Sequence, residues 1–134
     1  TVLVGGGSAL PSSLVLQIGD YFGGGVAGVG DLDCDGGVDL AVGAYHRFSN
    51  AGSVIVLLRG GGGAVVAAVE VAAPSGVTPA GSAWFGTAVA GLGDMWGDGV
   101  GDIAVGADGD PQEVWVVELS RSGAATGRWS TTPS

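Results

Sequence analysis

The sequence has no lysine and only four arginines in 134 residues, against 13 acidic residues, and its formal net charge is −9. So few basic side chains cannot line a surface that neutralises a phosphate backbone, which argues against nucleic-acid binding. The same acidity disfavours electrostatic attachment to anionic lipids. We therefore expect neither nucleic acid nor an anionic membrane surface among the partners of this chain.

Cysteine and long apolar runs are also scarce. Cys34 is the only cysteine, so no disulfide can form within the chain. The longest apolar stretch, residues 64–73, is interrupted by Glu70 and is too short to span a bilayer, so we expect no direct membrane insertion of this segment. The chain does not begin with methionine and shows no signal-peptide core. We expect a processed product or a piece of a longer protein.

Glycine, in contrast, is abundant. The chain has 29 glycines, about three times the usual share, which raises the prospect of disorder. The hydrophobic content of 46% opposes that interpretation, because short apolar runs between glycines are typical of strands joined by turns. We therefore predict an all-β, turn-rich domain. Its first strands are expected at residues 2–4, 14–18, 38–43, 53–58 and 65–72.

The most informative stretch is an acidic loop at residues 31–39, with Gly36 at its sixth position. Calcium takes about six to eight oxygen ligands, and alternating side chains in a tight turn can converge on one ion. An EF-hand would continue to a glutamate at the twelfth position, but Val42 stands there. A solvated acidic turn is the simpler alternative, and the spacing of the aspartates favours a metal site. These are Asp31, Asp33, Asp35 and Asp39.

The pattern repeats 63 residues later without a gap. The run from Phe22 to Asp31 matches the run from Phe85 to Asp94, and the strand after the first acidic loop matches residues 103–107. Repetition at such a period indicates units that stack on one another to cover their apolar faces. About four strands per unit is the number in one blade of a β-propeller. The second acidic loop contains Asp94, Asp98 and Asp102.

These residues resemble a known family. The order Phe-Gly, apolar strand, Gly-Asp-x-Asp-x-Asp-Gly, strand, Gly-Ala and then Gly-Ser-Val-Ile-Val-Leu is similar to the FG-GAP repeat. That repeat builds the N-terminal β-propeller of integrin α subunits and of related surface proteins. The resemblance implies one FG-GAP segment over residues 1–134, with repeats at 20–82 and 83–134. It predicts two blades, as a partial propeller or as a ring completed by other copies of the chain.

In that family the acidic loop joins the first two strands of a blade and binds calcium. The resemblance therefore implies one strong calcium site and one weaker site, because Trp96 at the third position of the second loop offers no oxygen. The implied ligands of the first site are the side chains of Asp31, Asp33, Asp35 and Asp39 and the backbone of Gly37. Those of the second site are the side chains of Asp94, Asp98 and Asp102 and the backbone of Val100.

Two repeats are too few to close an integrin-type propeller. Residues 123–134 show little strand character, so we expect the second blade to lack a regular fourth strand. We hypothesise that the apolar segment 14–18 completes that blade, either in a longer chain or through a head-to-tail contact between copies.

The resemblance implies a calcium-stabilised module for cell adhesion, or for binding a protein or glycan ligand at the cell surface, within the ectodomain of a larger protein. Its candidate contact residues are Tyr45, His46, Arg47 and Phe48, which share one loop. The alternative is a non-catalytic accessory module of a larger secreted enzyme. The serines and the lone histidine have no catalytic spacing, so we expect this chain not to be an enzyme.

Other signature residues are predicted to be structural. Phe22 and Phe85 are expected to fill the gap between blades, and Gly23 and Gly86 to let the backbone pass close to a neighbouring strand. Burial between blades is expected for two tryptophans, and solvent-facing positions for three glutamates. These are Trp84 and Trp115, and Glu70, Glu113 and Glu118.

Overall fold

A computed structural model describes residues 14, 16–72, 83–109 and 112–131 of the chain. It confirms the all-β prediction, with two four-stranded antiparallel sheets. The first sheet contains β1 (Phe22–Gly30), β2 (Asp39–Ala44), β3 (Ser53–Arg59) and β4 (Val65–Ala72). The second contains β5 (Phe85–Gly93), β6 (Asp102–Ala107), β7 (Glu113–Leu119) and β8 (Ala125–Thr131). A short helical turn, α1 (Arg47–Asn50), lies between β2 and β3.

Each strand of either sheet pairs with the next strand along the chain. The first strand of each sheet has a register shift at an equivalent place, between Phe22 and Val26 in β1 and between Phe85 and Ala88 in β5. Such bulges bend a strand and increase its twist. The sequence repeat is therefore matched by a repeat of the local backbone structure.

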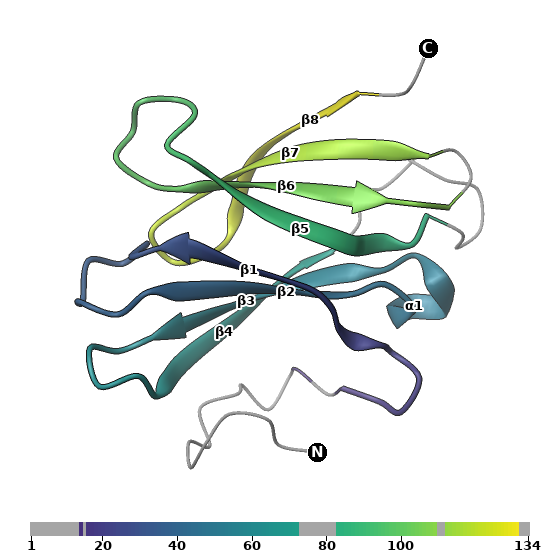
Figure 1. Cartoon of the computed structure of the whole chain (residues 1–134), viewed down its shortest axis with the longest axis horizontal. Coiled ribbons are helices and arrows are strands. Elements are labelled where there is room, and N and C mark those ends of the chain that lie inside the picture. Colours follow the sequence, from purple (N-terminus) through teal and green to yellow (C-terminus); the bar gives the residue numbers. More distant parts are fainter. Residues whose placement is uncertain (1–13, 15, 73–82, 110–111, 132–134) are drawn as a thin grey trace.

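The two sheets lie one above the other, with β1 and β5 next to each other (Figure 1). The loops that follow β1 and β5 emerge at the left end of this view, and α1 lies at the right end. Because antiparallel strands alternate in direction, the β1–β2 and β3–β4 loops share one end of the first sheet and the β2–β3 connection lies at the other. The acidic loops are thus separated from α1 by the length of the strands.

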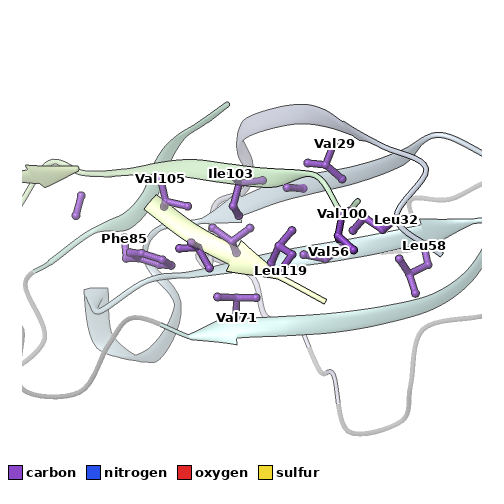
Figure 2. Close-up of a cluster of buried hydrophobic side chains, with 14 residues drawn as sticks. Val29, Leu32, Val56, Leu58, Val71, Phe85, Val100, Ile103, Val105 and Leu119 are labelled. Atoms are coloured by element: carbon purple, nitrogen blue, oxygen red, sulfur yellow. The ribbon is translucent and has the colours of Figure 1, made fainter. Parts of the chain in front are cut away.

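The main hydrophobic core lies between the two sheets (Figure 2). Phe85, Ile103 and Val105 contribute to it from the second sheet and are fully buried. Val54 and Val56 meet them from the first sheet, also without exposed surface. Full burial of one such side chain stabilises a fold by about 1.5–3 kcal/mol, so this core is the main contact holding the sheets together. The prediction that Phe85 fills the gap between the two units is confirmed.

The sheets use different faces in this core, although the sequence repeat makes the two sheets equivalent. Ile103 and Val105 of the second sheet face the core. Their repeat equivalents, Leu40 and Val42, belong instead to a separate apolar cluster on the outer face of the first sheet. The two sheets therefore pack one behind the other in the same orientation. Their contact joins unlike faces and is not related by a two-fold axis. Each end of the stack consequently has one sheet face that the other sheet does not cover.

The N-terminal segment covers part of the outer face of the first sheet. Leu14 and Leu16 pack, partly buried, against the cluster that contains Val42 and Ile55. Neither leucine lies in a strand. The prediction of a strand at residues 14–18 is therefore wrong, and so is the hypothesis that this segment completes the second sheet. Its apolar side chains cover a sheet face and do not extend a sheet edge.

The second sheet is completed by its own strand, β8. The prediction that residues 123–134 lack a regular strand is wrong, because the backbone of β8 pairs along β7, with Val116 opposite Trp129 and Val117 opposite Arg128. The strand follows from this pairing, which a composition rich in glycine and threonine does not reveal. The strand expected at residues 2–4 lies outside the described residues.

The sheets approach each other most closely through glycines. A β-carbon on Gly43 would overlap the backbone carbonyl of Gly86 in the other sheet. Gly86 has a φ of +101°, and a β-carbon there would lie 2.5 Å from the carbonyl oxygen of Ser53. The predicted close approach at Gly86 is therefore confirmed. Gly23 has the same φ of +101° but no atom near its open side, so only its backbone conformation requires glycine.

The remaining aromatic predictions hold in part. Phe22 packs in the outer cluster of the first sheet and not between the two sheets, so its predicted place in the gap between the described units is wrong. Trp115 packs partly buried against the main core. Trp84, however, is 37% exposed. Its predicted burial is wrong, because it lies in the turn that precedes β5 with a φ of 55°, and not within the strand itself.

Candidate metal centre

The two acidic loops occupy equivalent places in the sheets. Residues 31–38 join β1 to β2, and residues 94–101 join β5 to β6. Each loop is anchored by one apolar side chain in the main core, Leu32 in the first loop and Val100 in the second. Both side chains are buried, whereas Asp31, next to Leu32, is exposed. The apolar anchor fixes the loop, and the acidic side chains remain available for an ion.

Three carboxylates meet in the first loop. One oxygen each of Asp31, Asp33 and Asp39 lies within 4.8 Å of the others. The Asp31 carboxylate accepts hydrogen bonds from the backbone N–H of Asp35 at 3.1 Å and of Gly36 at 2.9 Å. These bonds wrap the loop around its first carboxylate. Like charges so close disfavour ionisation of one another unless a cation is present, so a bound cation would stabilise this arrangement.

Asp39 has a second role that its spacing does not reveal. Its side chain is fully buried, and its Oδ2 accepts a hydrogen bond from the backbone N–H of Leu32 at 2.7 Å. Its Oδ1 accepts from the N–H of Arg59, at the end of β3, also at 2.7 Å. The carboxylate thus ties the beginning of the loop to the neighbouring strand. Each oxygen retains a further lone pair that a cation could use.

Asp33 shows most directly that the loop fits a cation. Its Oδ1 is buried from solvent and has no hydrogen-bond partner in the described part of the chain. Burial, and then the negative charges of Asp35 and Asp39, raise the pKa of the Asp33 carboxyl. A buried acceptor without a partner is costly, and a cation would satisfy an ionised carboxylate among other carboxylates. The residues present therefore suit a bound metal ion.

The other two predicted ligands of the first site lie differently. Asp35 is not one of the three converging carboxylates, and its Oδ1 accepts a hydrogen bond from the backbone N–H of Gly37 at 3.0 Å. Gly37 is packed against the β3–β4 turn. A β-carbon at Gly37 would overlap the carbonyl of Arg59 and lie 2.5 Å from that of Gly60. Glycine is therefore required here by packing, independently of any role of its carbonyl as a ligand.

The second loop brings together Asp94, Asp98 and Asp102, again with one oxygen each within 4.8 Å of the others. Asp98 is the repeat equivalent of Asp35, whereas the place of Asp33 is taken by Trp96. The Trp96 side chain is 48% exposed and supplies no oxygen. The two clusters thus share the first and the last aspartate of the loop. They differ in the middle one, which is Asp33 in the first loop and Asp98 in the second.

The first carboxylate of the second loop is held by three backbone donors. Asp94 accepts hydrogen bonds from the N–H groups of Gly97 at 2.7 Å, Asp98 at 3.1 Å and Gly99 at 2.7 Å. These bonds, that from Gly99 above all, lower the pKa of the Asp94 carboxyl. Asp94 therefore remains ionised, and able to bind a cation, at a lower pH than an ordinary aspartate.

Asp102 repeats the second role of Asp39. It is fully buried, and its two oxygens accept hydrogen bonds from the backbone N–H of Met95 at 2.9 Å and of Leu119 at 3.0 Å. The backbone N–H of Val100 donates to Asp98 at 3.0 Å, which matches the bond from Gly37 to Asp35. The same hydrogen-bond pattern therefore recurs in both sheets.

One contact beside the first loop was not predicted from the sequence. Arg121, in the turn between β7 and β8, donates a hydrogen bond from Nη1 to Sγ of Cys34 at 2.6 Å. Cys34 is exposed and has a φ of 63°. The two residues are 87 positions apart, so no local pattern could reveal the contact. It ties the first acidic loop to the second sheet.

The four candidate contact residues lie at the opposite end of the sheets, and Arg47 differs from the rest. It is 7% exposed and forms ion pairs with Asp20, at 2.9 Å, and with Glu70. Glu70 also accepts a hydrogen bond from Ser53 Oγ at 2.7 Å, so its predicted solvent-facing position is wrong. The hydrogen bond that Arg47 donates to the Glu70 carboxylate is the main cause that raises the pKa of Arg47. Arg47 therefore acts as a buried support for its loop.

The other three candidates are more accessible. Tyr45 and His46 are partly buried, and Phe48 is exposed. The rings of Tyr45 and His46 contact those of Tyr21 and Trp84, two residues that were not predicted to join them. The sequence repeat could have indicated that these two rings occupy equivalent places, because Tyr21 and Trp84 both stand immediately before a Phe-Gly pair.

A comparison with models of known protein families finds no match for this chain. None of the helical residues that the structure describes forms a segment with the length and apolar character needed to cross a membrane.

Proposed function

We propose that this chain is a calcium-binding module of the FG-GAP type, in which two blades of a β-propeller form a non-catalytic binding platform outside the cell. The observation that carries the proposal is the duplicated acidic site. Both loops hold three converging carboxylates at equivalent points of the two sheets. In both, the last aspartate is buried and bonded to the end of the third strand. The recurrence of three converging carboxylates in both sheets is the result expected if the two loops share the role of holding an ion.

Calcium is the ion that suits these groups best, because it takes about six to eight oxygen ligands in flexible geometry. In the first loop Asp31, Asp33 and Asp39 would hold it, with Asp35 and the carbonyl of Gly37 as further ligands. Bound calcium would neutralise the clustered charge and fix the loop, which is a structural role. Extracellular calcium modules bind with dissociation constants of about 0.1–1 mM, so a location outside the cell would keep even a weak site occupied.

In the second loop Asp94, Asp98 and Asp102 would hold the ion, with the carbonyl of Val100 as a further ligand. Trp96 leaves this loop one carboxylate short of the first. Affinity in calcium loops is adjusted through the number of charged ligands, so we propose that the second site is the weaker one.

The stepwise packing of the sheets supports a propeller. A propeller requires that each blade pack with one face on the blade before it and with the other face on the blade after it. The use of different faces by the two sheets satisfies that requirement, because Val105 faces the core while its repeat equivalent Val42 does not. Such a heterologous contact can continue from the outer face of the second sheet, through a further blade or another copy, whereas Leu14 and Leu16 cover part of the outer face of the first sheet.

The substitution Trp96→Asp tests the calcium proposal, because it restores to the second loop the carboxylate that the first has in Asp33. Trp96 is 48% exposed, so its replacement should disturb the core little. We expect the calcium affinity of the second site to rise by about tenfold or more, since ligand charge sets affinity. Calorimetric calcium titration of the intact chain measures this change.

Met95→Asp is the matched control. It adds the same charge one residue earlier, and Met95 is also exposed, at 56%. An equal rise in both variants would mean that general electrostatic attraction, and not coordination, explains the gain. The absence of calcium binding by either loop of the unmodified chain would contradict the proposal as a whole.

The uncovered face of the second sheet provides a test of the architecture. A groove of about 460 Å³ lies there, lined in part by Ala88, Gly106 and Val114. In the first sheet the equivalent of Gly106 is Gly43, which is in contact with Gly86 of the next sheet. We therefore propose that this groove receives the first strand of another blade, or of a second copy when the chain is isolated.

Isolated chains are accordingly expected to self-associate as their concentration rises, and Val114→Lys is expected to abolish the association. Val114 is 47% exposed at the groove, and a charge there could not be buried without a partner. Val66→Lys, at a position 55% exposed on β4, is the control and should leave association unchanged. Light scattering over a concentration series measures the molar mass. Association that survives Val114→Lys would place the contact elsewhere.

A further inference from the structure

Four aromatic rings gather at the end of the sheets away from the acidic loops. Tyr21 and His46 are stacked, with ring centroids 4.3 Å apart and an interplanar angle of 9°. Tyr45 stands edge-on to both, at 5.3 Å from Tyr21 and 4.7 Å from His46. Trp84 lies 5.8 Å from His46. We call these four residues the aromatic rim.

The aromatic rim is open to solvent. Tyr21 is 53% exposed and Trp84 is 37% exposed, although aromatic side chains of this size are usually largely buried. The rim is contributed by both sheets, since Tyr21 precedes β1 and Trp84 precedes β5. A group of exposed rings from separate segments is typical of an interaction site.

The backbone holds the two exposed rings in place at a cost. Tyr21 and Trp84 both have a φ of 55°, a conformation that bulky side chains rarely adopt. Each turn is closed by a hydrogen bond to the carbonyl of the aromatic residue, from the N–H of Gly24 at 3.2 Å and of Thr87 at 3.3 Å. Backbone strain of this kind is concentrated at ligand sites. Five of the six described non-glycine residues with positive φ lie at this end: Tyr21, Phe48, Ser49, Asn50 and Trp84.

A polar hollow of about 420 Å³ adjoins the rim, and His46 borders both. Its lining includes the polar residues Gln17 and Ser49, with Phe48 beside them. Residues with hydrogen-bonding donors and acceptors thus lie next to the aromatic rim, in which the rings of Tyr21 and His46 are nearly parallel. A pyranose ring needs this combination, because its C–H face packs on aromatic rings while its hydroxyls form hydrogen bonds.

We propose that the aromatic rim and the adjoining hollow bind a neutral glycan built of equatorially substituted pyranose rings. This inference rests on the proposed function as a binding platform and names its ligand class. The formal charge of −9 disfavours uronic-acid and sulfated glycans. Arg47 borders the hollow but is engaged with Asp20 and Glu70, so an acidic sugar gains little from it. Equatorial substitution leaves the broad C–H faces that a flat ring can cover.

Cellotetraose is the probe, with binding measured by calorimetry and by saturation-transfer NMR on the intact chain. Tyr21→Asn and Trp84→Asn remove the rings, and asparagine tolerates the left-handed conformation of both positions. We expect each variant to lose about tenfold or more in affinity, because stacking on the ring is lost. Trp84→Tyr keeps a ring and should retain most of the affinity. Val66→Ala shortens an exposed apolar side chain outside the rim and should have no effect.

His46→Ala provides an independent test if an asparagine variant fails to fold. It removes a ring of the aromatic rim at a position whose backbone φ is negative, −96°. Equal affinity for cellotetraose in the unmodified chain and in the rim variants would overturn the proposal. So would binding of a hexa-arginine peptide, lost in the rim variants, without binding of cellotetraose, since that result would assign the rim to a cationic peptide.

Calcium titration of the same samples separates this inference from the proposed function. Trp84→Asn should bind calcium as the unmodified chain does, because the rim and the acidic loops lie at opposite ends of the strands. A chain that binds calcium but not cellotetraose refutes the glycan site alone. A chain that binds cellotetraose but not calcium refutes the calcium sites alone.

Discussion

Asp39→Ala is expected to lower the free energy of unfolding by about 3–6 kcal/mol even in the presence of a chelator, because two buried hydrogen bonds to a charged group are lost, each worth about 1.5–3 kcal/mol. The carboxylate accepts from Leu32 and from Arg59, both at 2.7 Å. Without it, those two backbone N–H groups lose their partner. Urea denaturation followed by tryptophan fluorescence measures the change.

Asp31→Ala is the matched control for this prediction. Its carboxylate also accepts two backbone hydrogen bonds, from Asp35 and Gly36, but in an exposed part of the loop. Water can replace it there, so the expected loss in chelator is about 1 kcal/mol or less. Both variants should abolish calcium binding at the first site. If Asp31→Ala and Asp39→Ala destabilised the metal-free chain equally, Asp39 would be a ligand only and not also a tie between the loop and β3.

Gly43→Ala is expected to destabilise the fold by about 3 kcal/mol or more, since overpacking a close contact forces backbone shifts. The added methyl group would overlap the carbonyl of Gly86 in the other sheet, and a backbone carbonyl cannot turn aside as a flexible side chain can. The sheets would have to separate, and the main core, including Phe85, would open with them. Thermal and urea denaturation both report this loss.

Gly28→Ala tests whether the effect is specific to the sheet contact. Gly28 also lies in a strand of the first sheet, but a β-carbon there would meet only Val38 Cγ1 at 3.8 Å, an ordinary contact. We expect a change within about 0.5 kcal/mol for this variant. A comparable loss in Gly28→Ala and Gly43→Ala would attribute the effect to glycine replacement in general.

Local patterns predicted the strands well where the apolar runs were continuous. The segments 53–58 and 65–72 became β3 and β4 with little change, because each is bounded by turn residues and buried on one or both faces. β8 was missed because its sequence resembles a loop, and its strand depends on pairing with β7. The apolar segment 14–18 resembles a strand although it is not one. Its leucines pack on a sheet face, and a short apolar run fits that role as well as it fits a strand.

The acidic clusters were predictable because their aspartates are close in sequence. The spacing predicts that four aspartates converge in the first loop, and the structure brings one oxygen each of Asp31, Asp33 and Asp39 within 4.8 Å of the others. The fourth, Asp35, is not part of that cluster. Spacing could not show that Asp39 also binds the backbone of Arg59, 20 residues away. Nor could it show that Arg47 is buried, because its ion-pair partner Glu70 lies 23 residues away. These roles of Asp39 and Arg47 depend on contacts between segments far apart in the sequence, which local spacing does not reveal.

The contact between unlike faces of the two sheets bears on how a chain of this kind could lengthen during evolution. Because the two sheets contact through unlike faces, one repeat of 63 residues carries both halves of the same interface. Tandem duplication of that gene segment would add a sheet that already fits its neighbour on either side. Each added junction would use the same contacts, and only the first and last sheets would need residues of their own, such as Leu14 and Leu16, to shield a face from water.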